Sequence, residues 1–202
     1  MSKAKFITFE GIDGAGKSSH IGWFADALRA RGHSVVLTRE PGGTALGEKL
    51  RHIILHDAMQ PATEALLVFA ARQEHVLQVI TPALTRGDWV LCDRFTDATF
   101  AYQGYGRQFP LEKLATLEHW VHANLQPDLT VVFECTPAVA AARLAKARAA
   151  DKFEAEPEIF FRLVSDGYKK RAMENSARFA LVNSEQTPAE VQNALTQILT
   201  KL

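Results

Sequence analysis

Gly11-Ile12-Asp13-Gly14-Ala15-Gly16-Lys17-Ser18 is the stretch that decides the fold, because it matches the phosphate-binding pattern G-x-x-x-x-G-K-[ST] at every fixed position. An apolar run of strand length, residues 5–10, precedes it, and residues 17–31 have a helical pattern. The glycines let the backbone wrap around a phosphate, and the exposed N–H groups at the helix N-terminus supply positive charge. The stretch therefore predicts a site for a nucleoside triphosphate.

Within this loop each polar side chain has an expected role. Lys17 should reach the β- and γ-phosphates of ATP, and the Ser18 hydroxyl should be a ligand of Mg²⁺. The residues expected to contact ATP are Gly11, Ile12, Asp13, Gly14, Ala15, Gly16, Lys17, Ser18 and Ser19.

The length and amino-acid composition of the chain are typical of a globular protein. The chain has 202 residues, 47% of them hydrophobic and 23% charged, which predicts one globular domain over residues 1–202. The formal net charge is zero, so no broad basic surface for nucleic acid is expected. Cys92 and Cys135 lie in apolar runs and are expected to be free, buried thiols. With no signal-peptide pattern and no run long enough to span a membrane, we expect a cytoplasmic protein without a membrane partner.

Strand-like and helix-like segments alternate along the chain. The expected strands are residues 5–10, 34–38, 89–93, 130–135 and 179–182. The expected helices are residues 17–31, 46–55, 63–86, 111–125, 138–148, 158–175 and 189–202. This alternation, with strands that are apolar almost throughout, predicts a five-stranded parallel sheet flanked by helices, the three-layer α/β architecture of P-loop NTPases.

Arginines and other polar residues gather where the expected strands end. Such ends meet at one edge of a parallel sheet, where ligands of these folds bind. Any one arginine could be a surface charge, but a set facing a triphosphate indicates a second anionic ligand, since guanidinium groups bind phosphate oxygens in a bidentate fork. The set is Arg39, Arg51, Arg72 and Arg94.

Several of these residues belong to longer motifs. They are Phe9-Glu10-Gly11 leading into the loop, Thr38-Arg39-Glu40-Pro41-Gly42-Gly43-Thr44, Leu50-Arg51, Phe69-Ala70-Ala71-Arg72, and Asp93-Arg94-Phe95 followed by Ala101-Tyr102-Gln103-Gly104. With these motifs the chain resembles the thymidylate kinases of the bacterial type over nearly its whole length. The resemblance implies the reaction ATP + dTMP → ADP + dTDP with Mg²⁺, and a homodimer.

The resemblance also implies roles for the acceptor site. Arg94 and Arg51 would bind the dTMP phosphate, and Asp93 would hold Mg²⁺ through water or fix Arg94. Arg72 and Gln103 would bind the thymine edge, and Tyr102 would pack against the deoxyribose. Asp13 and Glu40 would lie near the acceptor sugar and phosphate, or else form salt bridges with the arginines. The full expected dTMP set is Asp13, Arg39, Glu40, Arg51, Phe69, Arg72, Arg94, Thr99, Tyr102 and Gln103.

The aromatic residue expected to stack on the base is Phe69. Aromatic residues of the family often lie four positions before the arginine, where this chain has Val68. Phe69 lies three positions before Arg72, and both spacings share its helical face. Core packing is the alternative role for Phe69.

Residues 143–156 resemble the lid of the family. Gly14 carries no charge where some members of the family have a catalytic arginine, so Arg143, Lys146 or Arg148 should stabilise the transferring phosphoryl group. A basic helix end favoured by the helix dipole is the alternative. The expected catalytic residues are therefore Lys17, Arg94 and Asp13 together with Arg143, Lys146 and Arg148. Residues 183–188 are expected to hold adenine mostly through their backbone.

Two other functions stay open from the sequence. One is a kinase for another nucleotide or nucleoside, and the other is a nucleotide-binding protein without activity. The intact Lys17, Ser18 and Arg94 argue against the second. For a dimer contact, Phe100, Leu114 and Trp120 are the candidate residues.

Overall fold

The computed structural model describes residues 4–145, 152–153 and 156–202. Their sheet has five parallel strands in the order β2-β3-β1-β4-β5. The strands are β1 (Phe6–Glu10), β2 (Val35–Arg39), β3 (Trp89–Asp93), β4 (Leu129–Glu134) and β5 (Phe179–Asn183). The expected α/β fold and all five expected strands are confirmed, each within a residue at either end.

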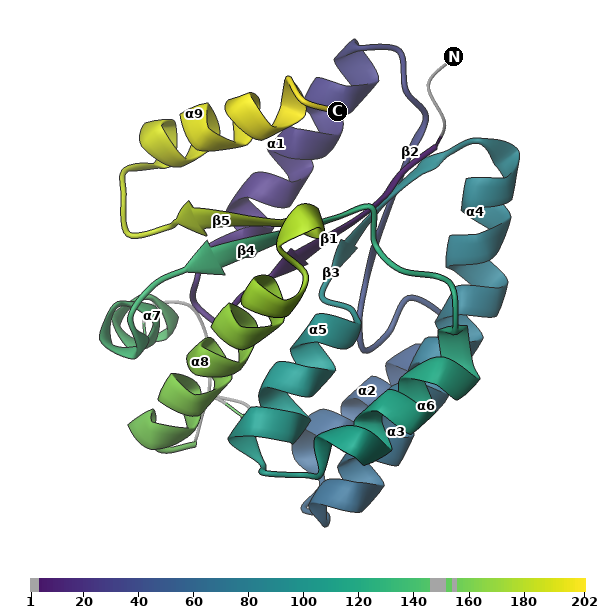
Figure 1. Ribbon diagram of the computed structural model, residues 1–202, viewed down its shortest axis with the longest axis vertical. Coiled ribbons are helices and arrows are strands. Elements are labelled where there is room, and N and C mark those ends of the chain that lie inside the picture. The colour runs from purple at the N-terminus through teal and green to yellow at the C-terminus, as the bar shows by residue number, and fades with distance from the viewer. Residues whose placement is uncertain (1–3, 146–151, 154–155) are drawn as a thin grey trace.

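Helices cover both faces of this sheet (Figure 1). On one face lie α1 (Lys17–Ala30) and α9 (Pro188–Leu199). On the other face lie α8 (Glu158–Glu174), α5 (Thr96–Thr99) and a group made of α2 (Ala45–His56), α3 (Pro61–His75) and α6 (Leu111–His122). The remaining helices are η1 (Val76–Ile80), α4 (Thr81–Arg86), η2 (Phe100–Gly106), α7 (Pro137–Leu144) and η3 (Ser176–Arg178).

Because its strands are largely apolar, the sheet is stable only when helices pack against both of its faces. Every residue of β1 is buried, and its Ile7 and Phe9 belong to a core cluster shared with Phe24 of α1 and Phe133 of β4. The Phe9 and Phe24 rings meet edge-on with their centroids 5.3 Å apart. A strand buried on both faces has no side to show to water, so apolar residues predominate in it.

The helical segment 96–106 is the main departure from the expected elements. There α5 continues into a π-helical stretch, η2, although no helix was expected. Gly104 and Gly106 lower its intrinsic helix propensity. Packing against α8 overrides that propensity, because Gly106 lies against the Phe160 ring and Tyr105 lies against Gly167. The long expected helix over 63–86 is likewise α3, η1 and α4 in one run, with a π-helical turn in the middle.

A buried carboxylate ties the helices to the sheet. Asp97 of α5 is 1% exposed and accepts hydrogen bonds from Arg171 Nε (2.9 Å) and from Arg178 Nη1 (2.7 Å). Thr130 Oγ1 of β4 joins the cluster through Arg178 Nη1 at 2.6 Å. Although burial alone would raise it, these two arginines hold the pKa of Asp97 below its usual value. One carboxylate thus joins α5, α8, η3 and β4.

No helix in the described ranges is both long and apolar enough to cross a membrane. Cys92 and Cys135 are free thiols, the first buried as expected and the second only partly buried.

The Asp97 cluster makes a stability prediction. Asp97→Asn removes the negative charge that pairs with two largely buried guanidinium groups, so we expect it to lower the free energy of unfolding by about 3 kcal/mol. Urea unfolding followed by circular dichroism measures this. Asp26→Asn is the control, because its pair with Arg29 is exposed and is expected to contribute less than about 1 kcal/mol. Equal effects of the two changes would contradict the role of Asp97.

Candidate active site

The phosphate-binding loop lies between the end of β1 and the start of α1. Lys17 is buried, and its Nζ donates to the carbonyl oxygens of Gly11 (3.0 Å) and Ile12 (3.1 Å). Gly14 has a left-handed φ of 82°, and a Cβ at this position would collide with the backbone of Ala140. The loop and α7 can therefore approach each other only because Gly14 has no side chain.

Arg143 links this loop to the far side of the sheet. Its Nη2 donates to the carbonyl oxygen of Ser184, just after β5, at 2.7 Å, and its Nη1 lies 3.4 Å from the carbonyl oxygen of Gly14. Arg143 therefore lies against the phosphate-binding loop. Lys146 and Arg148 lie outside the described residues.

Arg94 connects the phosphate-binding loop to the neighbouring pocket. Its Nη1 donates to the Gly11 carbonyl oxygen (2.8 Å) and to the Tyr168 hydroxyl (3.0 Å). Its Nη2 donates to Asp13 Oδ1 (2.8 Å) and to the Tyr102 hydroxyl (3.1 Å). Although burial would lower it, Asp13 holds the pKa of Arg94 well above its usual value. In turn, although burial would raise it, Arg94 holds the pKa of Asp13 well below its usual value.

Glu10 positions two neighbours of Arg94, the backbone of Phe95 and the side chain of Tyr168. Its carboxylate is fully buried and accepts hydrogen bonds from the Phe95 N–H (2.7 Å) and from the Tyr168 hydroxyl (2.9 Å). Burial, with Asp97 adding to it, raises the pKa of Glu10 to about 8. Glu10 thus fixes both the backbone that follows Arg94 and the tyrosine that Arg94 contacts.

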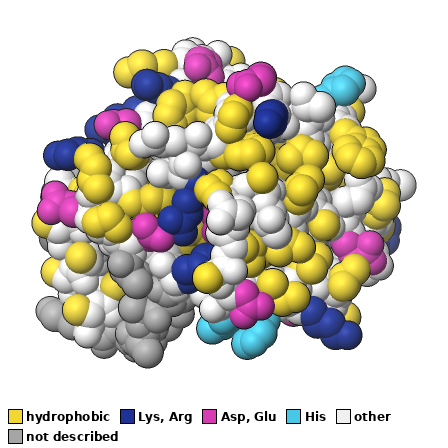
Figure 2. Space-filling view, turned by 90° about the horizontal axis from the view of Figure 1, so that it is seen from below, with side chains coloured by type: hydrophobic (Ala, Val, Ile, Leu, Met, Phe, Trp, Pro, Cys, Tyr) yellow, Lys and Arg dark blue, Asp and Glu magenta, His cyan; other side chains and the backbone are white. Residues whose placement is uncertain are grey.

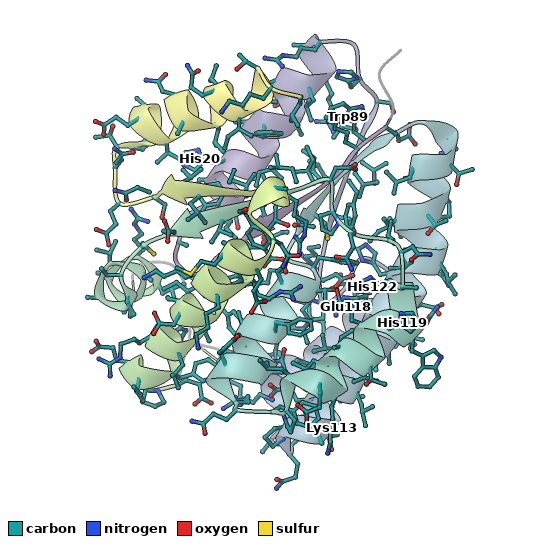
Figure 3. All side chains as sticks on the ribbon, viewed as in Figure 1. His20, Trp89, Lys113, Glu118, His119 and His122 are labelled. Carbon is teal, nitrogen blue, oxygen red and sulfur yellow. The ribbon has the colours of Figure 1, made fainter. Side chains whose placement is uncertain are left out.

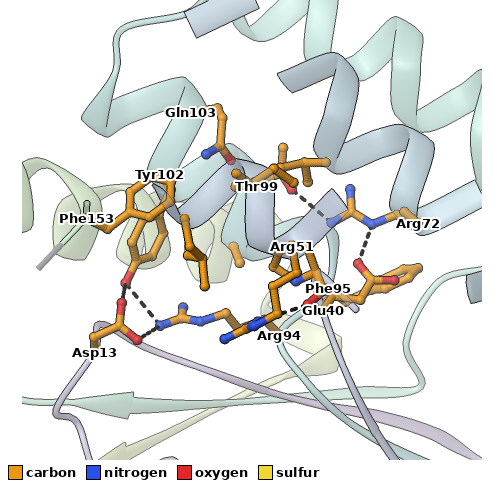
Figure 4. Close-up of a pocket in the computed structure, with 15 residues that line it drawn as sticks. Asp13, Glu40, Arg51, Arg72, Arg94, Phe95, Thr99, Tyr102, Gln103 and Phe153 are labelled. Carbon is orange, nitrogen blue, oxygen red and sulfur yellow. Dashed lines mark hydrogen bonds and ion pairs between the residues drawn. The ribbon is translucent and has the colours of Figure 1, made fainter. Parts of the chain in front are cut away.

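Beside Arg94 opens a pocket of about 600 Å³ of empty space (Figure 4). Several elements contribute to its walls, including the phosphate-binding loop, α2, α3 and the segment after β3. The lining residues are Asp13, Glu40, Pro41, Arg51, Ile54, Leu55, Val68, Arg72, Arg94, Phe95, Ala98, Thr99, Tyr102, Gln103 and Phe153.

Arg72 is the buried cation of this pocket. Its Nε donates to Glu40 Oε2 at 2.7 Å, and its Nη2 donates to Thr99 Oγ1 at 2.9 Å. Glu40 also contacts His75 Nδ1 at 2.8 Å, and although burial would raise it, Arg72 holds the pKa of Glu40 below its usual value. Arg72 Nη1 is buried and has no hydrogen-bond partner among the residues that the structure describes. A buried donor without a partner is costly, so this nitrogen is suited to a ligand acceptor.

At the end of β3, Asp93 carries a second unpartnered atom. Its Oδ1 is buried and has no hydrogen-bond partner within the described part of the chain. The Ser18 residue is exposed at the start of α1. A carboxylate and a hydroxyl are oxygen donors of the kind that Mg²⁺ binds together with phosphates and water.

Histidines do not take part in this pocket. His20 lies on α1, and His119 and His122 lie on α6 (Figure 3). His122 is buried and bonds Thr96 Oγ1 through Nε2 at 2.6 Å, so it holds α6 against α5. The pocket therefore presents arginines and carboxylates rather than an imidazole base.

Comparisons with known proteins agree with this geometry. The family model described as thymidylate kinase matches residues 9–195. Curated thymidylate kinases of Cupriavidus metallidurans and Paraburkholderia xenovorans are 58% and 55% identical, and the matches cover 99% and 98% of this chain and 100% and 98% of those proteins. The crystal structure of thymidylate kinase from Ehrlichia chaffeensis is similar with a TM-score of 0.80 at 31% identity, over 98% of this chain and 99% of that one. The chain belongs to the thymidylate kinase family. It is accordingly an ATP-dependent phosphotransferase with the P-loop NTPase fold.

Most residues expected in the acceptor site of this thymidylate kinase do lie together. One pocket contains Asp13, Glu40, Arg51, Arg72, Arg94, Thr99, Tyr102 and Gln103. Arg51 is held there by a hydrogen bond from its Nη1 to the Pro41 carbonyl oxygen at 2.9 Å. Glu40 takes the role given as its alternative, since it pairs with Arg72.

Phe69 does not line this pocket, contrary to expectation. It is 1% exposed and packs in a cluster with Ala65, Phe100 and Leu114. Val68, one residue earlier, faces the pocket instead. The helix can direct only one of two successive residues to that side, because neighbouring residues on a helix point about 100° apart.

Arg39 also lies outside the pocket. Its Nη2 pairs with Glu48 Oε2 at 2.9 Å, and its side chain is 56% exposed. The expectation that Arg39 contacts the acceptor therefore does not match this geometry, because the β2 end directs that side chain to α2 and solvent.

Sequence reasoning missed several contributors to the site of this kinase. Glu10 had a signal, since it is a charged residue inside an apolar strand that must be buried. Tyr168 and Phe153 had none, because they come from segments far along the chain that only folding brings beside Tyr102 and Arg94.

Glu10 makes a pH prediction. Folding raises the pKa of Glu10 from 4.5 to about 8, so the folded protein holds one more proton than the unfolded chain between these values. The contribution of Glu10 to stability is therefore greatest below about pH 4.5 and falls as the pH rises towards 8. We expect Glu10→Gln to flatten this part of the dependence, as measured by urea unfolding at a series of pH values. Glu158→Gln, at an exposed position, should leave the slope as it is. An unaltered slope in Glu10→Gln would contradict the prediction.

Proposed function

We propose that this kinase transfers the γ-phosphoryl group of ATP to dTMP and forms dTDP, with dTMP bound in the pocket beside Arg94. The observation that carries the proposal is the position of Arg94. Its guanidinium touches both the phosphate-binding loop at Gly11 and the acceptor pocket at Tyr102. A phosphate that exchanges these bonds for its own would face the γ-phosphate of ATP across a short distance.

The base end of the pocket supports a pyrimidine. Arg72 Nη1 offers a donor without a partner in the described structure, and Gln103 lines the same pocket (Figure 4). Arginine can only donate, which suits a carbonyl such as O4 of thymine. Val68, Phe95 and Ala98 supply the apolar surface for the ring.

At the sugar end we assign Tyr102 to the deoxyribose. Its hydroxyl donates to Asp13 Oδ2 at 3.0 Å and its ring lies 4.8 Å from the Arg94 guanidinium carbon. The ring is therefore fixed in place and would leave no space for a 2′-hydroxyl next to a phosphate held by Arg94.

The donor site takes ATP along residues 11–19. Lys17 would exchange the carbonyls of Gly11 and Ile12 for phosphate oxygens, and Arg143 would exchange those of Gly14 and Ser184. Ser18 and Asp93 would hold Mg²⁺, which neutralises charge on the β- and γ-phosphates when bound. The unpartnered Oδ1 of Asp93 supports this assignment. Adenine would lie near residues 183–188, beside Arg143.

In this reaction the protein itself makes and breaks no covalent bond with the substrates. The acceptor phosphate oxygen is already anionic at neutral pH, so no general base is required, and the residues act by alignment and charge neutralisation. Phe153 and Tyr102 meet edge-on with ring centroids 5.7 Å apart at the pocket wall. Such cover keeps water from the transferred group.

For the chain as a whole we propose one kinase domain over residues 1–202, with the lid at residues 143–156, working in the cytoplasm. Residues 146–151 and 154–155 of that segment lie outside the described residues. The free thiols Cys92 and Cys135 are consistent with a reducing compartment.

We also propose a homodimer through α2, α3 and α6. Apolar side chains gather over these helices, to the right in Figure 2. Trp120 of α6 is 79% exposed, and Leu66 and Leu77, eleven positions apart in the run of α3 and η1, are exposed as well. Exposed apolar surface of this kind marks contact sites. Phe100 and Leu114, named as candidates for this contact, are buried in the core instead.

The reaction is tested by coupled detection of ADP with dTMP, dUMP, dCMP and thymidine as acceptors. We expect ADP formation that depends on dTMP. Arg94→Ala should lower kcat/KM for dTMP by about 100-fold or more, since it removes a charged phosphate ligand, while ATP binding changes little. Arg86→Ala, which removes an exposed pair with Asp88, is the control. A wild-type protein without dTMP-dependent ADP would refute the function, and equal losses for thymidine and dTMP binding would refute the role of Arg94.

The dimer is tested by sedimentation. Trp120→Glu places a charge in the proposed apolar contact, and we expect the dimer dissociation constant to rise by about tenfold or more. Met173→Glu is the matched control, because Met173 is equally exposed at 79% but lies on α8. A wild-type monomer, or equal effects of the two changes, would contradict the proposed surface.

A further inference from the structure

Gln103 lies on the wall of the acceptor pocket, and its carboxamide is held by one neighbour. The residue is 3% exposed, and its Nε2 donates to Glu64 Oε1 of α3 at 2.8 Å. Glu64 does not line the pocket and is itself 1% exposed. The neighbour of a pocket residue therefore decides how that residue is turned.

A carboxamide has two different ends, a donor NH₂ group and an acceptor oxygen. An ionised carboxylate can only accept, so it admits only the NH₂ end of Gln103. The oxygen of Gln103 is then directed to the other side, where the pocket lies.

Two cations lie against the Glu64 carboxylate. Lys152 Nζ lies 2.9 Å from Glu64 Oε2, and Arg107 Nε lies 3.5 Å from Glu64 Oε1. Arg107 is turned towards Glu64 by a second pair, from its Nη1 to Glu156 Oε1 at 2.6 Å. A buried carboxylate with two cations against it is compensated in place and has little freedom to turn.

We propose that Glu64 is a positioning residue that fixes the orientation of Gln103 and thereby sets which pyrimidine the pocket accepts. This inference rests on the proposed function. With Gln103 so turned, the same pocket presents an acceptor oxygen from Gln103 and a donor from Arg72 Nη1. That pair complements a ring N–H next to a carbonyl, which is the imide edge of thymine and uracil.

Cytosine has the opposite pattern at both positions. Its ring nitrogen is an acceptor and would face the oxygen of Gln103, and its amino group is a donor and would face Arg72. Both contacts would leave buried polar groups unpaired. Glu64 thus contributes to selection at the ring nitrogen although it does not touch the base.

The test is Glu64→Gln, assayed with dTMP, dUMP and dCMP. The new carboxamide replaces one of the two accepting oxygens by an NH₂ group. With its oxygen on Lys152, this NH₂ group faces Gln103 and turns the oxygen of Gln103 away from the pocket. We expect KM for dTMP and dUMP to rise about tenfold, the equivalent of one lost hydrogen bond. The ratio of kcat/KM for dTMP to that for dCMP should fall by about tenfold or more. The ratio of dTMP to dUMP should not change, because both share the imide edge.

Three controls separate positioning from a general loss of structure. Glu174→Gln makes the same chemical change at an exposed site on α8 and should leave all ratios unchanged. In a Gln103→Met background, Glu64→Gln should have no further effect on the dTMP to dCMP ratio, since the group through which it acts is gone. The exchange Glu64→Gln with Gln103→Glu returns an acceptor to the pocket and should recover the preference for dTMP.

Equal losses with dTMP, dUMP and dCMP would overturn the proposal, because a merely structural role predicts that result. So would an effect on the ratio that persists in the Gln103→Met background, or a double exchange that folds and fails to recover the preference. Thermal unfolding of each variant identifies those that do not fold. If Glu64→Gln does not fold, Lys152→Met takes its place, and its effect on the dTMP to dCMP ratio is compared in the wild-type and Gln103→Met backgrounds. A wild-type protein inactive with dTMP would instead refute the proposed function itself, so the two failures are distinct.

Discussion

The site depends on the way Arg94 is held. Its backbone has a left-handed φ of 70°, which costs a side-chain-bearing residue roughly 1–3 kcal/mol. The N–H of Arg94 donates to the Phe9 carbonyl oxygen at 3.0 Å, and the next N–H, of Phe95, donates to Glu10. Both anchors belong to β1. Strand β1 therefore leads into the phosphate-binding loop and also fixes the backbone of Arg94. The loop and the acceptor pocket are both positioned by this one strand.

Buried ion pairs extend this arrangement outwards. Asp13 pairs with Arg94, Glu40 with Arg72, and Asp97 with Arg171 and Arg178. Pairs of this kind contribute little net stability, because removing charges from water offsets their attraction. Their effect here is geometric, since each joins segments from different elements and has few alternative arrangements. The carboxyl edge of the sheet is thereby held in one shape before any substrate binds.

The sequence alone was sufficient to predict those elements whose structure is determined by residues close together in the chain. The phosphate-binding loop, the apolar strands and the amphipathic helices all follow from neighbouring residues, and the structure confirms those elements. It was insufficient where distant segments decide. Helical structure over 96–106 depends on packing against α8, and the choice of Val68 over Phe69 depends on how α3 is rotated against α6. Glu64 and Lys152 could not be paired in advance, because eighty-eight positions separate two residues that end 2.9 Å apart.

Two cations at the phosphate-binding loop are held by hydrogen bonds to the protein's own backbone. Lys17 and Arg143 both donate to backbone carbonyls of this loop, so the buried Lys17 and the partly buried Arg143 each have an acceptor. ATP binding is therefore an exchange of neutral acceptors for anionic ones rather than the filling of a vacant site. The gain is the difference between the two kinds of hydrogen bond, about a factor of two in strength. A phosphate must compete with the loop's own carbonyl oxygens for these two cations, so part of its binding energy only replaces contacts that the protein already makes.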